Sequence, residues 1–238
     1  MSLFKRKYSK NAAKSRVSRN PDYRIITFDD PSSPSSEAFR RIKIGLDLSH
    51  SEGCGLVVQM ASALRGEGKT TACLNIAATY VEDGKKVIII DLDLRCPRIH
   101  RAFGVENKNG VVDYLAGKID LQAAIKRGEN GIDFINRGLS VTYPTTVLGS
   151  EKLAALIAEL KGEYDIVLID CPPVLMVSDA CIISKFCDGA VYVVSSRVTE
   201  KGAAKEAVNV LKQNNVKIFG AVLTEVSDSS KKQYYYYG

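Results

Sequence analysis

Short apolar runs alternate with longer amphipathic stretches along most of the chain. Runs such as VIII at 87–90 and IVLI at 166–169 are apolar at every position, which is typical of strands buried on both faces of a parallel sheet. The stretches between them repeat their apolar residues with helical spacing. Strands are therefore predicted at 56–61, 87–92, 132–136, 165–170, 189–195 and 217–223, and the clearest helices at 69–82, 150–161 and 199–213. This alternation predicts an α/β fold, a mostly parallel sheet with helices on both faces in a single domain.

Both ends of the chain depart from this pattern. Residues 1–35 are a basic stretch followed by a Pro/Ser linker, and residues 227–238 show no apolar periodicity. We therefore expect a flexible arm and linker over 1–35, a folded domain over 36–226 and a flexible tail over 227–238. The tail contains four consecutive tyrosines, which cannot all face one core because neighbouring side chains point in different directions. They are Tyr234, Tyr235, Tyr236 and Tyr237.

Charge and hydropathy narrow the possible locations and partners. Residues 1–24 carry a net charge of +7, whereas the whole chain carries +6. Such an arm is expected to be solvated, or attracted to an anionic membrane surface or an acidic partner. Its basic residues are not interleaved with aromatic ones in the way that would support nucleic-acid binding. Neither a run of about 18 apolar residues nor a secretory signal is found, so a cytoplasmic protein is expected. Six cysteines without C-x-x-C spacing favour free thiols over a zinc site.

The stretch ASALRGEGKTT (61–71) lies between a predicted strand and a predicted helix and fits the phosphate-loop pattern. Gly66 and Gly68 allow the backbone dihedrals with which successive N–H groups surround a phosphate, and the helix N-terminus adds partial positive charge. Lys69 is expected to reach the β- and γ-phosphates, and the Thr70 hydroxyl to bind Mg²⁺. Nucleotide contacts are therefore predicted at Gly66, Glu67, Gly68, Lys69, Thr70 and Thr71.

Acidic residues follow two further predicted strands. Asp91 and Asp93 end the strand in VIIIDLDLR, and Asp170 ends the strand in YDIVLIDCPP. Because ligands of such sheets bind beyond the carboxyl ends of the strands, these carboxylates are expected beside the phosphates, where Mg²⁺ would offset their repulsion. The alternative for Asp91 and Asp93 is ordinary surface pairing with Arg95 and Arg98.

Together these motifs resemble the bacterial tyrosine kinases of capsule and exopolysaccharide export, which have the P-loop ATPase fold. The resemblance is carried by SEAFRRIK (36–43), RGEGKTT (65–71), DLDLRCPRIHRAFG (91–104), GVVDYLAG (110–117), YDIVLIDCPPVLMVSDA (164–180), GAVLTEV (220–226) and the terminal tyrosine cluster. It implies a protein-tyrosine kinase that uses ATP and Mg²⁺, with Arg95 among the nucleotide contacts. It also implies autophosphorylation of Tyr234–Tyr237 between subunits, in the control of polysaccharide synthesis and export.

The resemblance also implies partners. The two-protein form of the family has a separate integral membrane chain-length regulator, whose cytosolic tail activates the kinase and recruits it to the inner face of the membrane. Further protein-tyrosine substrates and a counteracting tyrosine phosphatase are implied as well.

Assembly into a ring is implied through a helix that carries Glu37, Arg40 and Lys43. We expect this helix to begin at Glu37, capped by Ser35 or Ser36, with Phe39, Ile42 and Leu46 as its buried stripe. The simpler alternative is that Glu37 pairs with Arg41 within the helix. The family usually has arginine at the position of Lys43, proline at that of Arg65 and asparagine at that of Thr224, so ring contacts and nucleotide selectivity are expected to differ.

A mechanism follows as a hypothesis. Lys69 neutralises the phosphate oxygens, Thr70, Asp91 and Asp170 place Mg²⁺, and Asp93 accepts a hydrogen bond from the tyrosine hydroxyl. Four phosphotyrosines would add a charge of about −6 to −8, enough to cancel the net charge of +6 on the whole chain. This charge is expected to release the modified tails from a neighbour's site.

Two other functions remain open at this stage. A chromosome- or cell-division-partitioning ATPase shares the fold but has a second lysine after the first loop glycine, where this chain has Leu64. The other is an ATP-binding regulator of an export complex without catalysis, against which the intact lysine and carboxylates argue. A metal-cluster carrier would need paired cysteines that the sequence lacks.

Overall fold

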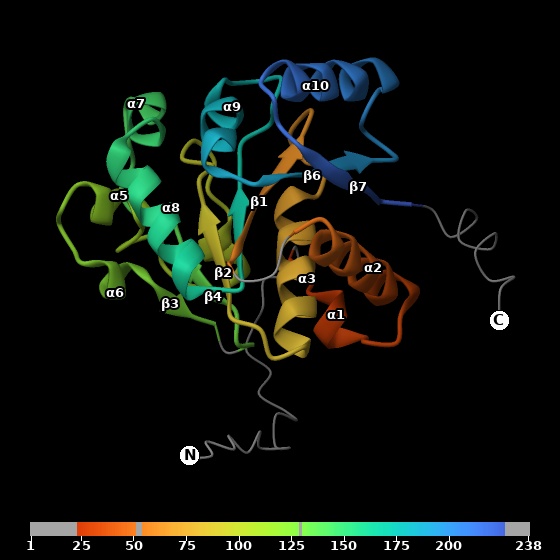
Figure 1. Cartoon of the computed structure of the whole chain (residues 1–238), viewed down its shortest axis with the longest axis horizontal. Helices are drawn as coiled ribbons and strands as arrows, with labels where there is room; N and C mark the ends of the chain where they lie inside the picture. The colour runs from red at the N-terminus through yellow and green to blue at the C-terminus, as the bar shows by residue number, and fades with distance from the viewer. Residues whose placement is uncertain (1–22, 51–53, 129, 227–238) are drawn as a thin grey trace, which may run out of the picture.

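A twisted, mostly parallel sheet forms the centre of the molecule (Figure 1). The computed structural model describes residues 23–50, 54–128 and 130–226. Within these residues the strand order is β3-β4-β2-β5-β1-β6-β7, and every neighbouring pair is parallel except β3–β4. The strands are β1 Leu56–Ser62, β2 Val87–Asp91, β3 Lys126–Arg127, β4 Asp133–Ile135, β5 Ile166–Asp170, β6 Gly189–Ser195 and β7 Ile218–Thr224.

Helices cover both faces of this sheet, which confirms the predicted fold class. The helices are α1 Ile26–Asp29, α2 Pro34–Leu48, α3 Lys69–Glu82, α4 Ile99–Ala102, α5 Val111–Leu115, α6 Leu121–Ala124, α7 Pro144–Leu148, α8 Glu151–Glu163, α9 Asp179–Ile183, the 3₁₀ turn η1 Ser184–Phe186, and α10 Lys201–Gln213. Alternate residues of β1 enter different cores, since Val58 packs with residues of α3 and Val57 with residues of α8. No helix among the described residues combines the length and apolar character needed to cross a membrane.

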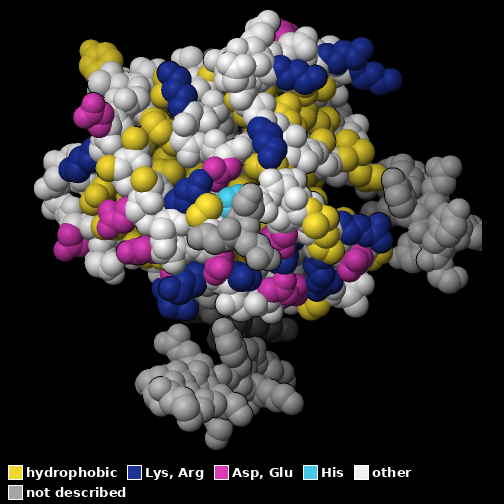
Figure 2. All heavy atoms as spheres, in the orientation of Figure 1, with side chains coloured by type: hydrophobic (Ala, Val, Ile, Leu, Met, Phe, Trp, Pro, Cys, Tyr) yellow, Lys and Arg dark blue, Asp and Glu magenta, His cyan; other side chains and the backbone are white. Residues whose placement is uncertain are grey.

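Charged side chains of both signs lie on the face of the molecule that Figure 2 shows. On the face shown in Figure 2, lysine and arginine side chains lie interspersed with aspartate and glutamate side chains. A mixed surface of this kind produces little net field at a distance, because neighbouring charges of opposite sign offset each other. The excess positive charge of the chain therefore belongs to its basic first 24 residues, as the sequence indicated.

The predicted strands and long helices agree with the structure to within about two residues, the uncertainty usual for element ends. The helix predicted at 69–82 has those bounds in α3, whereas the helices predicted at 150–161 and 199–213 are α8 and α10. The two-residue strand β3 and the short helices α4 to α7 were not predicted. Elements of two to five residues are too short to show a period.

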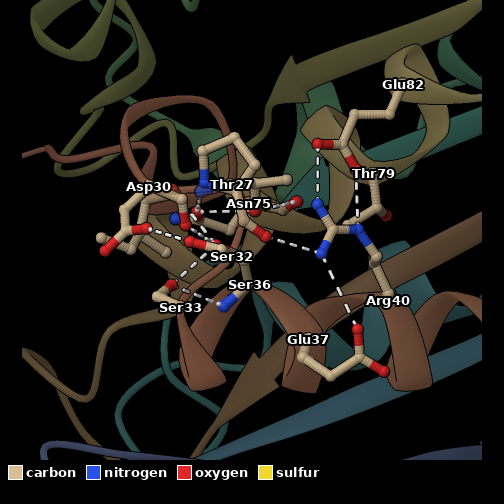
Figure 3. A network of polar contacts seen from close by, with 12 residues as sticks. Thr27, Asp30, Ser32, Ser33, Ser36, Glu37, Arg40, Asn75, Thr79 and Glu82 are labelled. Carbon is tan, nitrogen blue, oxygen red and sulfur yellow. Dashed lines mark hydrogen bonds and ion pairs between the residues drawn. The ribbon is translucent and has the colours of Figure 1, made fainter.

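The start of α2 differs from the prediction. The helix begins at Pro34, and the Ser33 hydroxyl accepts a hydrogen bond from the Ser36 N–H at 3.2 Å. Proline suits the first helical turn because its fixed φ is helical and no N–H is lost from the ladder. Ser36 instead donates its hydroxyl to the carbonyl of Asp30 at 2.7 Å and is fully buried (Figure 3). The predicted start at Glu37 with a Ser35 or Ser36 cap is therefore wrong, although Leu46 is buried as expected.

The last part of the expected flexible arm belongs to the folded body. Tyr23 and Ile25 are buried in the core beside α3, and α1 follows directly. The Thr27 N–H donates to the Asn75 side-chain oxygen at 3.1 Å, which attaches α1 to α3 (Figure 3). The boundary predicted at residue 35 is thus too late, because two apolar residues among polar neighbours suffice to attach the segment. Most of the basic arm and the whole tyrosine cluster lie outside the described residues.

Candidate active site

The phosphate loop joins the end of β1 to the start of α3. All of β1 is buried, residues 63–68 form the loop, and α3 begins at Lys69. Gly66 and Gly68 have φ values of +81° and +90°, the left-handed region that glycine enters without strain. A side chain at Gly68 would also come within 3.1 Å of the Thr224 methyl carbon. The two glycines therefore give the loop the conformation that the sequence predicted.

Lys69 and Thr70 both point into the protein at the base of this loop. The Lys69 side chain donates to the Ser62 hydroxyl at 2.8 Å, and Thr70 donates its hydroxyl to Asp170 at 2.6 Å. Burial lowers the pKa of Lys69, while the charges of Asp170, Asp93 and Glu67 act in the opposite direction. The ammonium group thus lies among acidic side chains, within reach of a ligand in the loop.

Asp91 and Asp170 end adjacent parallel strands in register with each other. Both are buried, at 0% and 2% exposure. One oxygen of Asp91 accepts hydrogen bonds from the N–H groups of Arg98 and Ile99, at 2.9 and 3.0 Å. Its other oxygen, and Oδ1 of Asp170, are buried without a hydrogen-bond partner among the described residues. These two buried carboxylate oxygens are therefore available to a hydrogen-bond donor or a cation.

The pKa values of both carboxyl groups reflect this placement. Burial and then the neighbouring Asp170 raise the pKa of Asp91 well above its usual range. Burial raises the pKa of Asp170 to about 6, although Lys69 and the Thr70 hydroxyl lower it. Two carboxylates that disfavour ionisation side by side suit a divalent cation, which would reverse that preference.

The donor set fits Mg²⁺, with a limit. Carboxylate and hydroxyl oxygens are the ligands that Mg²⁺ prefers, and Asp91, Asp170 and Thr70 supply them. Within the described ranges no group of three or more His, Cys, Asp or Glu side chains is arranged to hold a metal. A Mg²⁺ ion here therefore depends on nucleotide oxygens and water for its remaining ligands, as is usual in phosphoryl-transfer sites.

Asp93 and Arg95 lie in the loop after β2. Asp93 accepts a hydrogen bond from the Cys96 N–H at 2.9 Å and remains partly exposed. Arg95 makes two hydrogen bonds to the fully buried Asp179, at 2.8 and 3.2 Å. The surface pairing considered for Asp91 and Asp93 is thus not what the structure contains, since Arg95 pairs with Asp179 and Asp91 bonds to backbone N–H groups. A nucleotide contact by Arg95 stays a prediction.

Glu67 stabilises the loop from within. Its side chain is fully buried and accepts a hydrogen bond from the Leu64 N–H at 2.9 Å and another from the Thr199 hydroxyl. The Thr224 hydroxyl donates to the Glu67 carbonyl at 2.9 Å. The Glu67 carboxylate is therefore occupied by protein groups, so only its backbone is available for the predicted nucleotide contact. Thr71 is half-buried on the first turn of α3.

Three hydrogen-bonding side chains of this arrangement were not predicted from the sequence as supports of the loop. Ser62 accepts a hydrogen bond from Lys69 and donates to the Leu64 carbonyl at 2.8 Å. The hydroxyls of Thr199 and Thr224 each donate to Glu67. Isolated Ser and Thr residues carry no spacing signal, so only the fold brings them to the loop.

The residues predicted to contact a neighbouring subunit bond within this chain. Arg40 makes two hydrogen bonds of 3.0 Å to Glu82 at the end of α3, and Glu37 lies 3.7 Å from both Arg40 and Arg41 (Figure 3). Lys43 pairs with Asp47 at 2.8 Å and Asp83 at 2.7 Å. The intrahelical pairing of Glu37 and Arg41 is thus present, and the ring contact stays a prediction.

Comparison with known proteins agrees with this geometry. The profile of a family described as "AAA domain" matches residues 56–210. The chain is 35% identical to "Tyrosine-protein kinase YwqD" of Bacillus subtilis (strain 168), over 94% of this chain and 93% of that protein. It is 32% identical to the chimerical protein CapA2B2, with a TM-score of 0.79 over 84% of this chain and 88% of that one.

Other relatives are longer or more distant. The chain covers only 30% of "Putative tyrosine-protein kinase AmsA" of Erwinia amylovora, to which it is 31% identical. The septum site-determining protein MinD of Pyrococcus horikoshii, solved with Mg-ADP, matches with a TM-score of 0.59 at 25% identity. The fold is therefore that of nucleotide-binding P-loop proteins, and by sequence and structure the chain belongs to the family of bacterial tyrosine-protein kinases.

Proposed function

We propose that this kinase transfers the γ-phosphoryl group of ATP to the tyrosines of its own terminal cluster, between subunits, in the control of capsular or exopolysaccharide synthesis. The observation that carries the proposal is the meeting of Lys69, Thr70, Asp91 and Asp170 at one end of the sheet. The names of the relatives support the acceptor chemistry, and Tyr234–Tyr237 supply acceptors within the chain.

The reaction moves one phosphoryl group. The bond between the γ-phosphorus and the oxygen that bridges it to the β-phosphate breaks, and ADP leaves. A bond to the phenol oxygen forms, and the phenol proton passes through Asp93 to water. Such transfers need positioning and charge neutralisation more than covalent help. Lys69 neutralises the β- and γ-oxygens, and the loop N–H groups hold the phosphates. Thr70, Asp91 and Asp170 would hold Mg²⁺, which would supply further positive charge to the phosphate oxygens.

Asp93 receives the acceptor hydroxyl in this proposal. It is partly exposed at the mouth of the site, and one oxygen already accepts the Cys96 N–H. The other oxygen can accept a hydrogen bond from a tyrosine and align it with the γ-phosphorus. Because a phenol has a pKa of about 10, alignment contributes more than proton removal, which comes late in a loose transition state.

The partners are part of the same proposal. A membrane protein of the chain-length regulator type activates the kinase with its cytosolic tail and recruits it to the inner face of the membrane. Glu37, Arg40 and Lys43 contact a second copy in a ring, other protein tyrosines serve as substrates, and a tyrosine phosphatase reverses the reaction. Similarity to the chimerical protein CapA2B2 supports the pairing with a partner.

The test is the intact mass of the protein after incubation with ATP and Mg²⁺, with and without a peptide from the cytosolic tail of the partner. Additions of about 80 Da, up to four, are expected in the unchanged chain, because each phosphorylation adds HPO₃. They are expected to disappear in Lys69→Met and when Tyr234–Tyr237 are all replaced by Phe. ATP hydrolysis without any mass gain would instead favour a partitioning-type ATPase. The structural similarity to MinD is the observation that supports this second candidate.

A further inference from the structure

Glu225, the residue that follows β7, has an unusual backbone conformation. Its φ is +55°, in the left-handed backbone region that residues other than Gly, Asn and Asp seldom adopt. The other two non-glycine residues with positive φ in the described part of the chain are both asparagines. Something in the surroundings must therefore hold Glu225 in place, because a glutamate gains nothing from this conformation by itself.

Two serines at the end of β6 hold it. Ser195 donates its hydroxyl to the Glu225 side chain, and Ser196 donates its hydroxyl to the Glu225 carbonyl at 2.7 Å. The Ser196 N–H also donates to the carbonyl of Thr224 at 3.0 Å. Glu225 is thus attached through its side chain and through its backbone, at the point where the ladder between β6 and β7 ends (Figure 1).

The same residues connect to the phosphate loop. The Ser195 N–H donates to the Thr199 hydroxyl at 2.9 Å, and that hydroxyl donates to Glu67. Thr224, one residue before Glu225, donates to the Glu67 carbonyl. Glu225 therefore lies next to the strand end that contacts the phosphate loop, one residue before the end of the described chain.

We infer that Glu225 is a positioning residue for tail phosphorylation: its bonds to Ser195 and Ser196 fix the backbone at the end of the described chain, from which the tail continues, and so favour attached tyrosines over free ones. This inference rests on the proposed function, because it takes the tail as the substrate. Val226 and Tyr234 are eight residues apart, so the first acceptor lies at most about 29 Å from the end of the described chain. Over so short a link, a fixed starting point raises the effective concentration of the tyrosine at the active site of a neighbouring subunit in the same assembly.

The experiment compares an attached and a detached acceptor in the same protein. The attached rate is the initial rate of tail phosphorylation in the full chain. The detached rate is measured with a free peptide of residues 227–238, added to the full chain in which Tyr234–Tyr237 are replaced by Phe. Each rate is measured with Glu225 unchanged, with Glu225→Ala and with Glu225→Gln. The glutamine amide oxygen can still accept the Ser195 hydroxyl.

We expect Glu225→Ala to lower the attached rate about fivefold to tenfold while the detached rate stays within about twofold. Glu225→Gln is expected to restore most of the attached rate, and Glu206→Ala, an exposed acid on α10, is the matched control. Ser196→Ala removes only the bond to the Glu225 carbonyl, and it serves as a second test if Glu225→Ala fails to fold.

The inference is overturned if Glu225→Ala leaves the attached rate unchanged, or lowers the attached and detached rates by the same factor. A purely structural role would give the second result, since a damaged phosphate loop slows transfer to any acceptor. If the unchanged chain phosphorylates the free peptide but never its own tail, the proposed autophosphorylation fails and the inference fails with it. If the tail is phosphorylated at equal rates with and without the Glu225 side chain, only the inference fails.

Discussion

Asp91 and Asp170 lie opposite each other at the ends of β2 and β5, and each keeps one buried carboxylate oxygen without a hydrogen bond among the described residues. Strand register alone brings them together, although 79 positions separate them in the sequence. The arrangement is unfavourable for the protein without ligand, because two buried carboxyl groups repel when both ionise. A divalent cation bound to both carboxylates would offset this repulsion, so the pair favours the metal-bound state.

Replacing Asp91 by asparagine should uncouple Mg²⁺ from the nucleotide. In Asp91→Asn the amide oxygen would still accept the N–H groups of Arg98 and Ile99, but the charge that Mg²⁺ needs would be lost. We expect tyrosine phosphorylation to fall at least about a hundredfold. A ligand at a hundredfold excess over its Kd raises the free energy of unfolding by about 2.7 kcal/mol. The part of this stabilisation that Mg²⁺ adds to the ADP complex should disappear in the variant. Differential scanning fluorimetry with ADP, with and without Mg²⁺, measures this.

The control for that experiment is Asp165→Asn. Asp165 precedes β5 at its other end and pairs with the exposed Lys85 at 3.4 Å, so its loss should leave the response to Mg²⁺ intact. Equal responses of the Asp91 and Asp165 variants would contradict the assignment of Asp91 to the metal.

Lys69→Met should abolish phosphotyrosine without unfolding the protein. Lys69 is 8% exposed and burial lowers its pKa, so an apolar side chain of similar length suits the same space. The charge that neutralises the phosphates is lost, and a fall of at least about a hundredfold in transfer is expected. Phosphotyrosine immunoblots and circular dichroism together separate lost chemistry from lost fold. Lys85→Met, at a half-exposed lysine, should retain activity.

Thr224→Val tests the support that β7 gives to the phosphate loop. The Thr224 hydroxyl donates to the Glu67 carbonyl at 2.9 Å, and valine keeps the shape but removes the donor. Loss of one such bond costs about 1 kcal/mol, so ADP should bind about threefold to tenfold more weakly. Isothermal titration calorimetry gives the Kd directly, and an unchanged Kd would show that the loop holds its conformation without Thr224. Thr145→Val, at an exposed position of α7, is the matched control.

The sequence predicted the parts of the site that depend on residue type and short spacing. The glycines of the loop, Lys69 and Thr70 occupy fixed positions between a strand and a helix, and the carboxylates follow apolar strands, so their meeting follows from the parallel sheet alone. Long elements such as α3 were predictable for a similar reason, since their apolar period is sustained.

Other parts depend on contacts that no spacing encodes. Glutamate side chains are usually exposed, yet Glu67 is buried because Leu64 and Thr199 donate hydrogen bonds to its carboxylate. Arg95 looked free to meet a nucleotide, but Asp179, 84 positions later, holds its guanidinium. The early start of α2 was missed because Ser33, Ser35 and Ser36 are equally good caps by type. Pro34 and the burial of Ser36 decide among them.

Glu82→Gln should strengthen self-association, whereas Arg40→Ala should weaken it. Arg40 makes its two bonds of 3.0 Å to Glu82 within one chain, so a neighbouring subunit must compete with Glu82 for the same guanidinium (Figure 3). Removing the charge of Glu82 frees Arg40 at a modest cost in stability, about 0.2–1 kcal/mol for a partly exposed pair. Sedimentation velocity over a range of protein and salt concentrations measures the change. Arg41→Ala, at an exposed neighbour that lies 3.7 Å from Glu37, should leave association unchanged. If Glu82→Gln and Arg40→Ala shift the association in the same direction, Arg40 acts only within its own chain, and the ring contact lies elsewhere on the surface.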